Sequence, residues 1–136
     1  MGSWVKRLFG INREDAAIED TAAAWEDRAA RFLEGKGLKV VARNVRCRRG
    51  EIDILAVDWD EVVFVEVKAR RSRAFGGPEY AIDEKKKHRL VSAAKEIAVR
   101  EKLDGRAMRF DAVLIFTGSP EPEITHITDA FGEKTS

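Results

Sequence analysis

The stretch from residue 50 to residue 70, GEIDILAVDWDEVVFVEVKAR, constrains the fold of this chain more than any other segment. Its two runs rich in β-branched and aliphatic residues flank Trp59 and Asp60, which predicts a β-hairpin with a tight turn at these two residues. In the register that such a turn sets, Asp53 lies directly opposite Glu66. Two acids are therefore expected side by side within otherwise apolar strands.

The same register makes both faces of the hairpin apolar over most of their length. One face is apolar throughout, whereas the other is apolar near the turn and ionic at its far end. Both faces are therefore expected to be covered by other parts of the chain. The predicted pairs are Ile52–Val67, Ile54–Val65 and Ala56–Val63 on the first face, and Glu51–Lys68, Asp53–Glu66, Leu55–Phe64 and Val57–Val62 on the second.

Opposed carboxylates destabilise a sheet, because two charges about 4 Å apart repel by roughly 4 kcal/mol at an effective dielectric constant of ~20. One acid stays protonated, or a base bridges the pair, or a divalent cation binds between them. An acid in one strand and Glu-x-Lys in the next place two oxygen ligands and the Lys68 ammonium on one face, which favours Mg²⁺ or Mn²⁺ over zinc. The competing interpretation is a set of ordinary salt bridges, Glu51 to Lys68 and Asp53 or Glu66 to a nearby arginine.

The remaining elements alternate between helical and strand patterns. A capping arrangement at Asn12 predicts a first helix that ends at Gly35 to Gly37, and Pro78 opens a second helix that runs to about Lys102. Further strands are predicted at 38–46, 108–116 and 124–127. The expected fold class is α/β, a mixed five-stranded sheet flanked by helices in the order α-β-β-β-α-β-β. Residues 13–131 would form one domain between an N-terminal arm, 1–12, and a C-terminal tail, 132–136.

Composition and charge limit the class of protein, the cellular location and the partners that we expect. The chain has 136 residues, 44% of them hydrophobic and 36% charged, which suits one small globular domain. No segment has the length of a membrane span and the N-terminus lacks a secretory signal, so we expect a cytoplasmic protein without a membrane partner. Cys47 is the single cysteine, so neither an internal disulfide nor a structural zinc site is expected. The net charge is only +1, but bases cluster at 43–49, 68–73 and 85–89.

The chain resembles a known family through six blocks in the same order. They are AAAWEDRAARFLEGKGL, RNVRCRRGEIDILA, VFVEVKARR, FGGPEYAIDEKKKHRL, RFDAVLIF and ITDAF, which together extend over about residues 22–131. They resemble the YraN-like family of small bacterial proteins, in the restriction-endonuclease-like PD-(D/E)xK superfamily, which is similar to archaeal Holliday-junction resolvases. The resemblance implies a restriction-endonuclease-like three-layer fold and metal-dependent hydrolysis of DNA phosphodiester bonds, with branched DNA as one candidate substrate.

The resemblance also implies roles for individual residues. Asp53 and Glu66 would bind Mg²⁺ or Mn²⁺ with the backbone carbonyl of Val67, and Lys68 would hold or activate the attacking water. Glu26 matches an acid on the first helix that assists the metal site. Helical periodicity supports that placement, since Glu26 lies at the edge of the apolar stripe; a simple favourable charge near the helix N-terminus is the alternative. The family pattern has a proline before the aspartate, where this chain has Ile52, and the glutamine motif of RecB-like nucleases is absent.

Basic residues near this predicted site suggest a nucleic-acid partner, DNA in the first place. Phosphate contacts of this kind would give salt-sensitive binding without sequence specificity. A solvated helix face and a charged loop are the simpler alternative for any one of these bases. Lys86 is the position that matches the family's lysine. The candidates are Arg70, Arg71 and Arg73 on a mobile basic loop, and Lys85, Lys86, Lys87 and Arg89 on the second helix.

Three functions remain open after this reading: a nuclease, a nucleic-acid-binding module of the same fold with an idle metal site, and an interaction protein in DNA uptake or repair. A homodimer is suggested by analogy with resolvases alone. His88 and His126 are interpreted as surface or core residues, and Arg109 with Asp111 as a structural ion pair before a support for the site. Trp59 is expected to be exposed at the hairpin tip.

Overall fold

The computed structural model describes residues 22–71, 83–103 and 105–131. Within these ranges the order is a helix, three strands, a helix and two strands, as predicted. The elements are α2 (Ala22–Gly35), β1 (Lys39–Cys47), β2 (Gly50–Asp58), β3 (Glu61–Arg70), α3 (Glu84–Arg100), β4 (Met108–Phe116) and β5 (Glu123–Phe131). The predicted arm 1–12, tail 132–136, helix start at Asn12, most of the basic loop and Pro78 lie outside the described residues.

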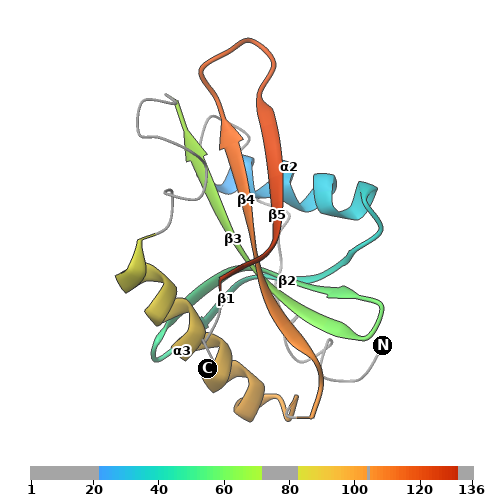
Figure 1. The fold of residues 1–136 in the computed structure, drawn as a ribbon, viewed down its shortest axis with the longest axis vertical. Coiled ribbons are helices and arrows are strands. Elements are labelled where there is room, and N and C mark those ends of the chain that lie inside the picture. Colours follow the sequence, from blue (N-terminus) through green and yellow to red (C-terminus); the bar gives the residue numbers. More distant parts are fainter. Residues whose placement is uncertain (1–21, 72–82, 104, 132–136) are drawn as a thin grey trace.

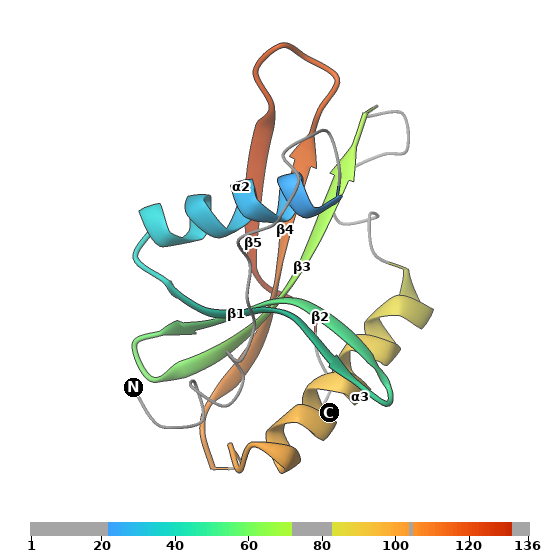
Figure 2. The same cartoon turned by 180° about the vertical axis from the view of Figure 1, so that it is seen from behind.

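The five strands form one mixed sheet in sequence order, β1-β2-β3-β4-β5. Neighbouring strands are antiparallel except β3 and β4, which are parallel. A parallel pair requires a crossover connection, and α3 lies within it. The two helices lie on opposite sides of the sheet, α3 in front in Figure 1 and α2 in front in Figure 2. The predicted three-layer α/β fold is therefore confirmed.

Each helix covers its own hydrophobic core. The core under α2 contains Leu33 with Ile54, Ala56, Val63 and Val65 of the hairpin. The core under α3 contains the other hairpin face with Leu90 and Ile97, and Phe64 is its largest fully buried side chain. Both faces of the hairpin are thus covered by a helix, which explains why both carry apolar side chains. The aromatic side chains of Trp25, Phe32 and Phe110 are half-buried; Trp25 packs against the core under α2 and Phe110 against the core under α3.

Glycine and a capping aspartate account for one end of each helix. Gly37, two residues after the last residue of α2, has a φ of 100°, in the left-handed region that glycine adopts most readily. The start of α3 is at Glu84, with Asp83 as its N-cap: the Asp83 carboxylate accepts a hydrogen bond from the Lys86 amide at 2.8 Å. Sequence reasoning missed this cap because Pro78 offered an earlier start signal.

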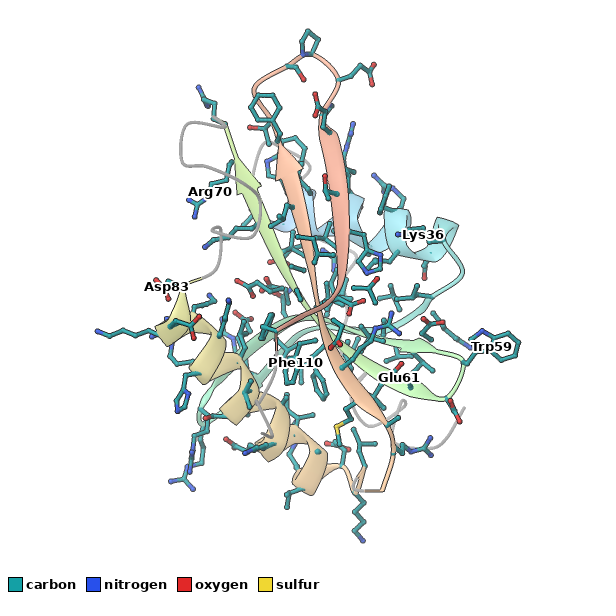
Figure 3. All side chains as sticks on the ribbon, viewed as in Figure 1. Lys36, Trp59, Glu61, Arg70, Asp83 and Phe110 are labelled. Carbon is teal, nitrogen blue, oxygen red and sulfur yellow. The ribbon has the colours of Figure 1, made fainter. Side chains whose placement is uncertain are left out.

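The hairpin turn lies at Trp59 and Asp60, as predicted, since Asp58 pairs with Glu61. Trp59 is 94% exposed and has a φ of 60°. Figure 3 shows its ring at the tip of the β2–β3 hairpin, pointing away from the sheet. The expected exposure of Trp59 is therefore confirmed.

The last strand is longer than predicted, Glu123–Phe131 instead of 124–127. Its C-terminal half is irregular: the register with β4 shifts between Phe110 and Ala112, and Asp129 has a φ of 55°. Polar residues interrupt the alternation of this edge strand, which explains why its full length was not recognisable from the pattern.

Candidate metal centre

A kink shared by β1 and β2 sets the position of Asp53. The ladder passes from Arg43–Ile54 to Val45–Ile52, and between these pairs lie Asn44 and Asp53. Asn44 has a φ of 51°, a left-handed conformation that asparagine tolerates better than most residues. Ile54 packs in the α2 core but Ile52 in the α3 core. The predicted placement of Ile52 on the same face as Ile54 is therefore wrong, because the kink rotates the strand between them.

The β2–β3 ladder stops where this kink begins. Its recorded pairs run from Asp58–Glu61 only as far as Ile54–Val65. Beyond that point Asp53 Oδ2 accepts a hydrogen bond from the Val67 amide at 2.9 Å. The Asp53 side chain therefore accepts a hydrogen bond that a backbone carbonyl of β2 would accept in a regular ladder. At this point β2 separates from β3. The predicted backbone pairs Ile52–Val67, Asp53–Glu66 and Glu51–Lys68 are not part of the ladder.

The two acids nevertheless lie beside each other. Glu66 is only 3% exposed. Its Oε1 atom is buried and accepts no hydrogen bond from an N–H group or a hydroxyl of the described residues, whereas Oε2 lies 3.3 Å from Lys86 Nζ. Burial, the charge of Asp53 and a hydrogen bond with its carboxyl raise the pKa of Glu66 to about 8, against the opposing effect of Lys86. Asp53 and Glu66 are therefore close enough to compete for one proton or to share one cation.

Glu26 approaches this pair from the α2 layer. Burial and then the charge of Asp53 raise the pKa of Glu26 to about 7, while Arg43 and a hydrogen bond from Asn44 act in the opposite direction. Helix α2 thus contributes an acid to the surroundings of Asp53, and the half-burial of Glu26 agrees with its expected place at the edge of the apolar stripe. Across the described ranges, however, no three Asp, Glu, His or Cys side chains converge closely enough to hold a metal ion together.

Two lysines flank the acids, and they differ in their contacts. Lys68 lies two residues after Glu66 on β3 and therefore on the same face of the strand. Its side chain is half-exposed and forms neither a hydrogen bond nor an ion pair with another described residue. The predicted partner of Lys68, Glu51, instead pairs with Arg46 at 3.5 Å. Lys86, at the start of α3, is the base that reaches Glu66, a contact that no sequence pattern indicated.

The predicted nucleic-acid residues that the structure describes are mostly at the surface. Arg70 and Arg71 are exposed at the end of β3. Lys85 and Arg89 are exposed on α3, and Lys87 pairs with Glu84 at 3.4 Å. Lys86 differs from them because its ammonium group contacts the Glu66 carboxylate. Arg73 lies outside the described residues.

The donor set fits a hard divalent cation in kind. Magnesium is commonly held by one or two carboxylates while it keeps several waters. Asp53 and Glu66 offer two such groups, and the buried Oε1 of Glu66 has no N–H or hydroxyl donor among the described residues, which is costly unless a proton or a cation binds there. The backbone of Val67 lies against Asp53 through its amide. Asp53 and Glu66 would hold the ion, with Glu26 near enough to add negative charge.

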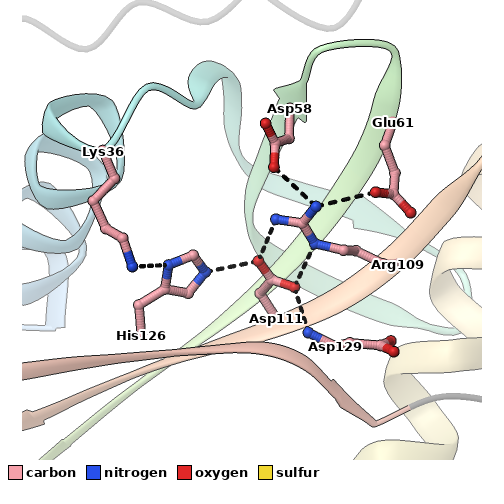
Figure 4. A network of polar contacts seen from close by, with 7 residues as sticks. All are labelled: Lys36, Asp58, Glu61, Arg109, Asp111, His126 and Asp129. Atoms are coloured by element: carbon pink, nitrogen blue, oxygen red, sulfur yellow. Dashed lines mark hydrogen bonds and ion pairs between the residues drawn. The ribbon is translucent and has the colours of Figure 1, made fainter.

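A second polar cluster, around Asp111, shows what a satisfied buried acid looks like in this fold (Figure 4). Asp111 is fully buried. It accepts hydrogen bonds from Arg109 Nε at 2.9 Å, His126 Nε2 at 2.7 Å and the Asp129 amide at 2.9 Å. Burial alone would raise the pKa of Asp111, but these hydrogen bonds hold it below its usual value.

The Asp111 cluster joins four elements. Arg109 also binds Asp58 and Glu61 beside the hairpin turn, and His126 Nδ1 lies 2.9 Å from Lys36 Nζ after α2. The predicted Arg109–Asp111 ion pair is therefore confirmed as part of a larger network. Since every partner of Asp111 is supplied by the protein, we interpret this cluster as structural, in contrast to Glu66.

Fold and site together define a three-layer α/β domain in which the buried, incompletely satisfied carboxylate of Glu66 lies beside the half-buried Asp53, at the point where two strands separate. A family model described as "Uncharacterised protein family UPF0102" matches residues 25–115. The chain belongs to this family. Within the described residues, neither helix combines the length and apolar character needed to cross a membrane.

Similar proteins cover most of this chain. It is 41% identical over 110 residues to a UPF0102 protein of Rhodococcus opacus, which spans 80% of this chain and 93% of that protein. It is 39% identical over 126 residues to a Klebsiella pneumoniae relative, 91% of this chain and 95% of the other. The UPF0102 protein YraN of Escherichia fergusonii is 42% identical over 117 residues, 85% and 86% of the two chains.

Proposed function

We propose that this protein binds DNA and hydrolyses its phosphodiester bonds with Mg²⁺ or Mn²⁺ held by Asp53 and Glu66. The observation that supports this most is the buried Glu66 Oε1, which no N–H group or hydroxyl of the described residues satisfies and which lies beside a second carboxyl group. In a site that serves only stability, a buried carboxylate oxygen is expected to have hydrogen-bond donors from the protein, as the oxygens of Asp111 have. The resemblance to restriction-endonuclease-like proteins supplies the reaction class.

The chain's own residues would divide the work as follows. The Val67 amide fixes the orientation of Asp53 through the 2.9 Å hydrogen bond, so that one carboxylate is preorganised before any ligand arrives. Lys68, half-exposed and unpaired among the described residues, would place its ammonium against the charge that develops on the phosphate. A bound divalent ion would supply a water that ionises near neutral pH.

The basic surface would hold the phosphate backbone. Arg70 and Arg71 at the end of β3 and Lys85 and Arg89 on α3 are exposed on the elements that flank Glu66. Contacts of this type position the duplex but do not read its sequence. We therefore expect recognition of DNA by its shape, and branched DNA is the candidate that the resolvase resemblance suggests.

A second candidate is a DNA-binding module whose carboxylate pair is idle. The observation that favours it is the contact of Lys86 Nζ with Glu66 at 3.3 Å, because a base beside the acids relieves their repulsion without a metal ion. Both candidates predict DNA binding. They differ in whether a divalent ion binds and whether DNA is cut.

The test compares the parent protein with Asp53→Asn and Lys68→Ala on linear, flapped and four-way DNA in Mn²⁺ and in Mg²⁺. Calorimetric titration with MnCl₂ provides a readout that does not depend on cleavage. The nuclease predicts Mn²⁺ binding and cleavage by the parent, loss of both in Asp53→Asn, and loss of cleavage alone in Lys68→Ala. DNA binding without Mn²⁺ binding would support the idle module, and light scattering on the same samples would test the homodimer.

A further inference from the structure

The turn between β1 and β2 is fastened to α3 by its backbone. Glu96 accepts hydrogen bonds from the amides of Arg48 at 3.0 Å and Arg49 at 3.1 Å. Arg100 Nη1 donates to the Arg46 carbonyl at 3.1 Å. At Gly50, an added β-carbon would lie 3.7 Å from the Ala93 side chain, so the turn packs directly on the helix.

This arrangement fixes the turn and leaves its cationic groups outside. The Glu96 carboxylate is occupied by amides, not by guanidinium groups, and Arg48 and Arg49 are both exposed. Neither side chain forms an ion pair with another described residue. Two adjacent arginines on an immobilised backbone lose less conformational entropy when they bind an anion than they would on a free loop.

The same side of α3 continues this positive charge toward the acid pair. Lys85, Arg89, Glu96 and Arg100 follow one another at spacings of four, seven and four residues, which places them along one stripe of the helix. Glu96 and Arg100 mark that stripe as the one facing the turn. Lys85 and Arg89 therefore extend it toward the helix N-terminus, where the adjacent Lys86 contacts Glu66.

We propose that Lys85, Arg89, Arg48 and Arg49 form a phosphate-binding row that holds one duplex arm of the DNA substrate and leads from the acid pair to the β1–β2 turn. This inference rests on the proposed function. From Lys85 to Glu96 the helix rises about 16 Å at ~1.5 Å per residue. At ~3.4 Å per base pair, the row spans about five base pairs on one side of the cleaved bond.

The experiment measures the affinity of catalytically silent Asp53→Asn protein for duplex DNA as a function of salt. In that background Arg48→Ala/Arg49→Ala is compared with Arg31→Ala/Arg106→Ala, which removes the same charge from exposed positions elsewhere. Two lost phosphate contacts lower the slope of log K against log salt by about 1.8, which corresponds to about 60-fold weaker binding at ~0.1 M salt. The control pair keeps the parental slope.

Two further measurements sharpen the result. Arg48→Lys/Arg49→Lys restores the slope, because a phosphate contact needs the charge and not the guanidinium shape. Shortening one duplex arm below about five base pairs weakens the Asp53→Asn protein but not the Arg48→Ala/Arg49→Ala form. Salt-dependent binding that is unchanged in the alanine pair overturns the row and leaves the proposed function intact. No salt-dependent DNA binding by the starting protein overturns both.

Discussion

The buried carboxyl of Glu66 makes the stability of this fold depend on pH in the direction opposite to that of an ordinary ion-paired acid. Its pKa rises from 4.5 to about 8 in the folded state, so between these values the native protein binds more protons than the unfolded chain. Stability therefore falls as pH rises through this window and is fully present only below it. At about 1.4 kcal/mol per pH unit, the ceiling of the loss is about 5 kcal/mol, a large share of the total for a small domain.

Burial is the largest cause of the raised pKa of Glu66 and the charge of Asp53 the next, so replacing Glu66 itself should remove this pH dependence. Glu66→Gln keeps the shape of the side chain but carries no ionisable proton. We expect urea unfolding in metal-free buffer to show falling stability of the parent between pH 5 and 8, and a much flatter curve for Glu66→Gln. Glu34→Gln, at an exposed position on α2, should follow the parent.

The outcome that refutes this reasoning is a parent curve that is flat or rises from pH 5 to 8, since that would mean that Glu66 is charged at little cost. An equal pH dependence in parent and Glu66→Gln would assign the effect to another group. Glu26, whose pKa is also raised, is the residue to test next with Glu26→Gln.

Three further predictions concern metal binding and the structural elements. Mn²⁺ affinity of the parent should increase from pH 6 to 8, because the ion displaces the proton of the acid pair; a pH-independent affinity in calorimetry would contradict the site. Asp111→Asn should lower the free energy of unfolding by about 3–5 kcal/mol, because it breaks a buried network, whereas Asp58→Asn, at the half-exposed edge of that network, should cost less than about 1 kcal/mol; equal losses in urea titration would contradict this. Asp83→Ala should cost about 1 kcal/mol through loss of the α3 cap, and Asp83→Asn much less; identical melting curves would rule out the cap.

The element order was readable from the sequence because it depends on local periodicity. The Trp59-Asp60 turn fixed the register near the tip, and the observed pairs from Ile54–Val65 to Asp58–Glu61 agree with it. The same rule failed beyond Ile54, because regular alternation assumes regular backbone dihedrals. Asn44 breaks that regularity with its positive φ, and it does so from a neighbouring strand whose influence is not visible in the hairpin itself.

The sequence was likewise enough to identify the acids of the candidate site, but not the residues that they contact. Asp53, Glu66 and Glu26 were predicted, and the effect of the Asp53 charge on the pKa of both glutamates fits that choice, although their roles at a metal remain a prediction. The pairing of Lys86 with Glu66 and the fastening of the β1–β2 turn by Glu96 were not predictable. Each joins residues far apart in sequence, and their distance depends on how α3 packs against the sheet.

By itself, the sequence determined which segments form strands and helices, where the hairpin turns, and that acids would lie within it, since these follow from spacing and side-chain type along the chain. Only the tertiary structure decided which bases face those acids and which face solvent. The reason is geometric: a kink at Asn44 and Asp53 turns the strands, and the packing of α3 then sets which of its neighbouring lysines and arginines points inward.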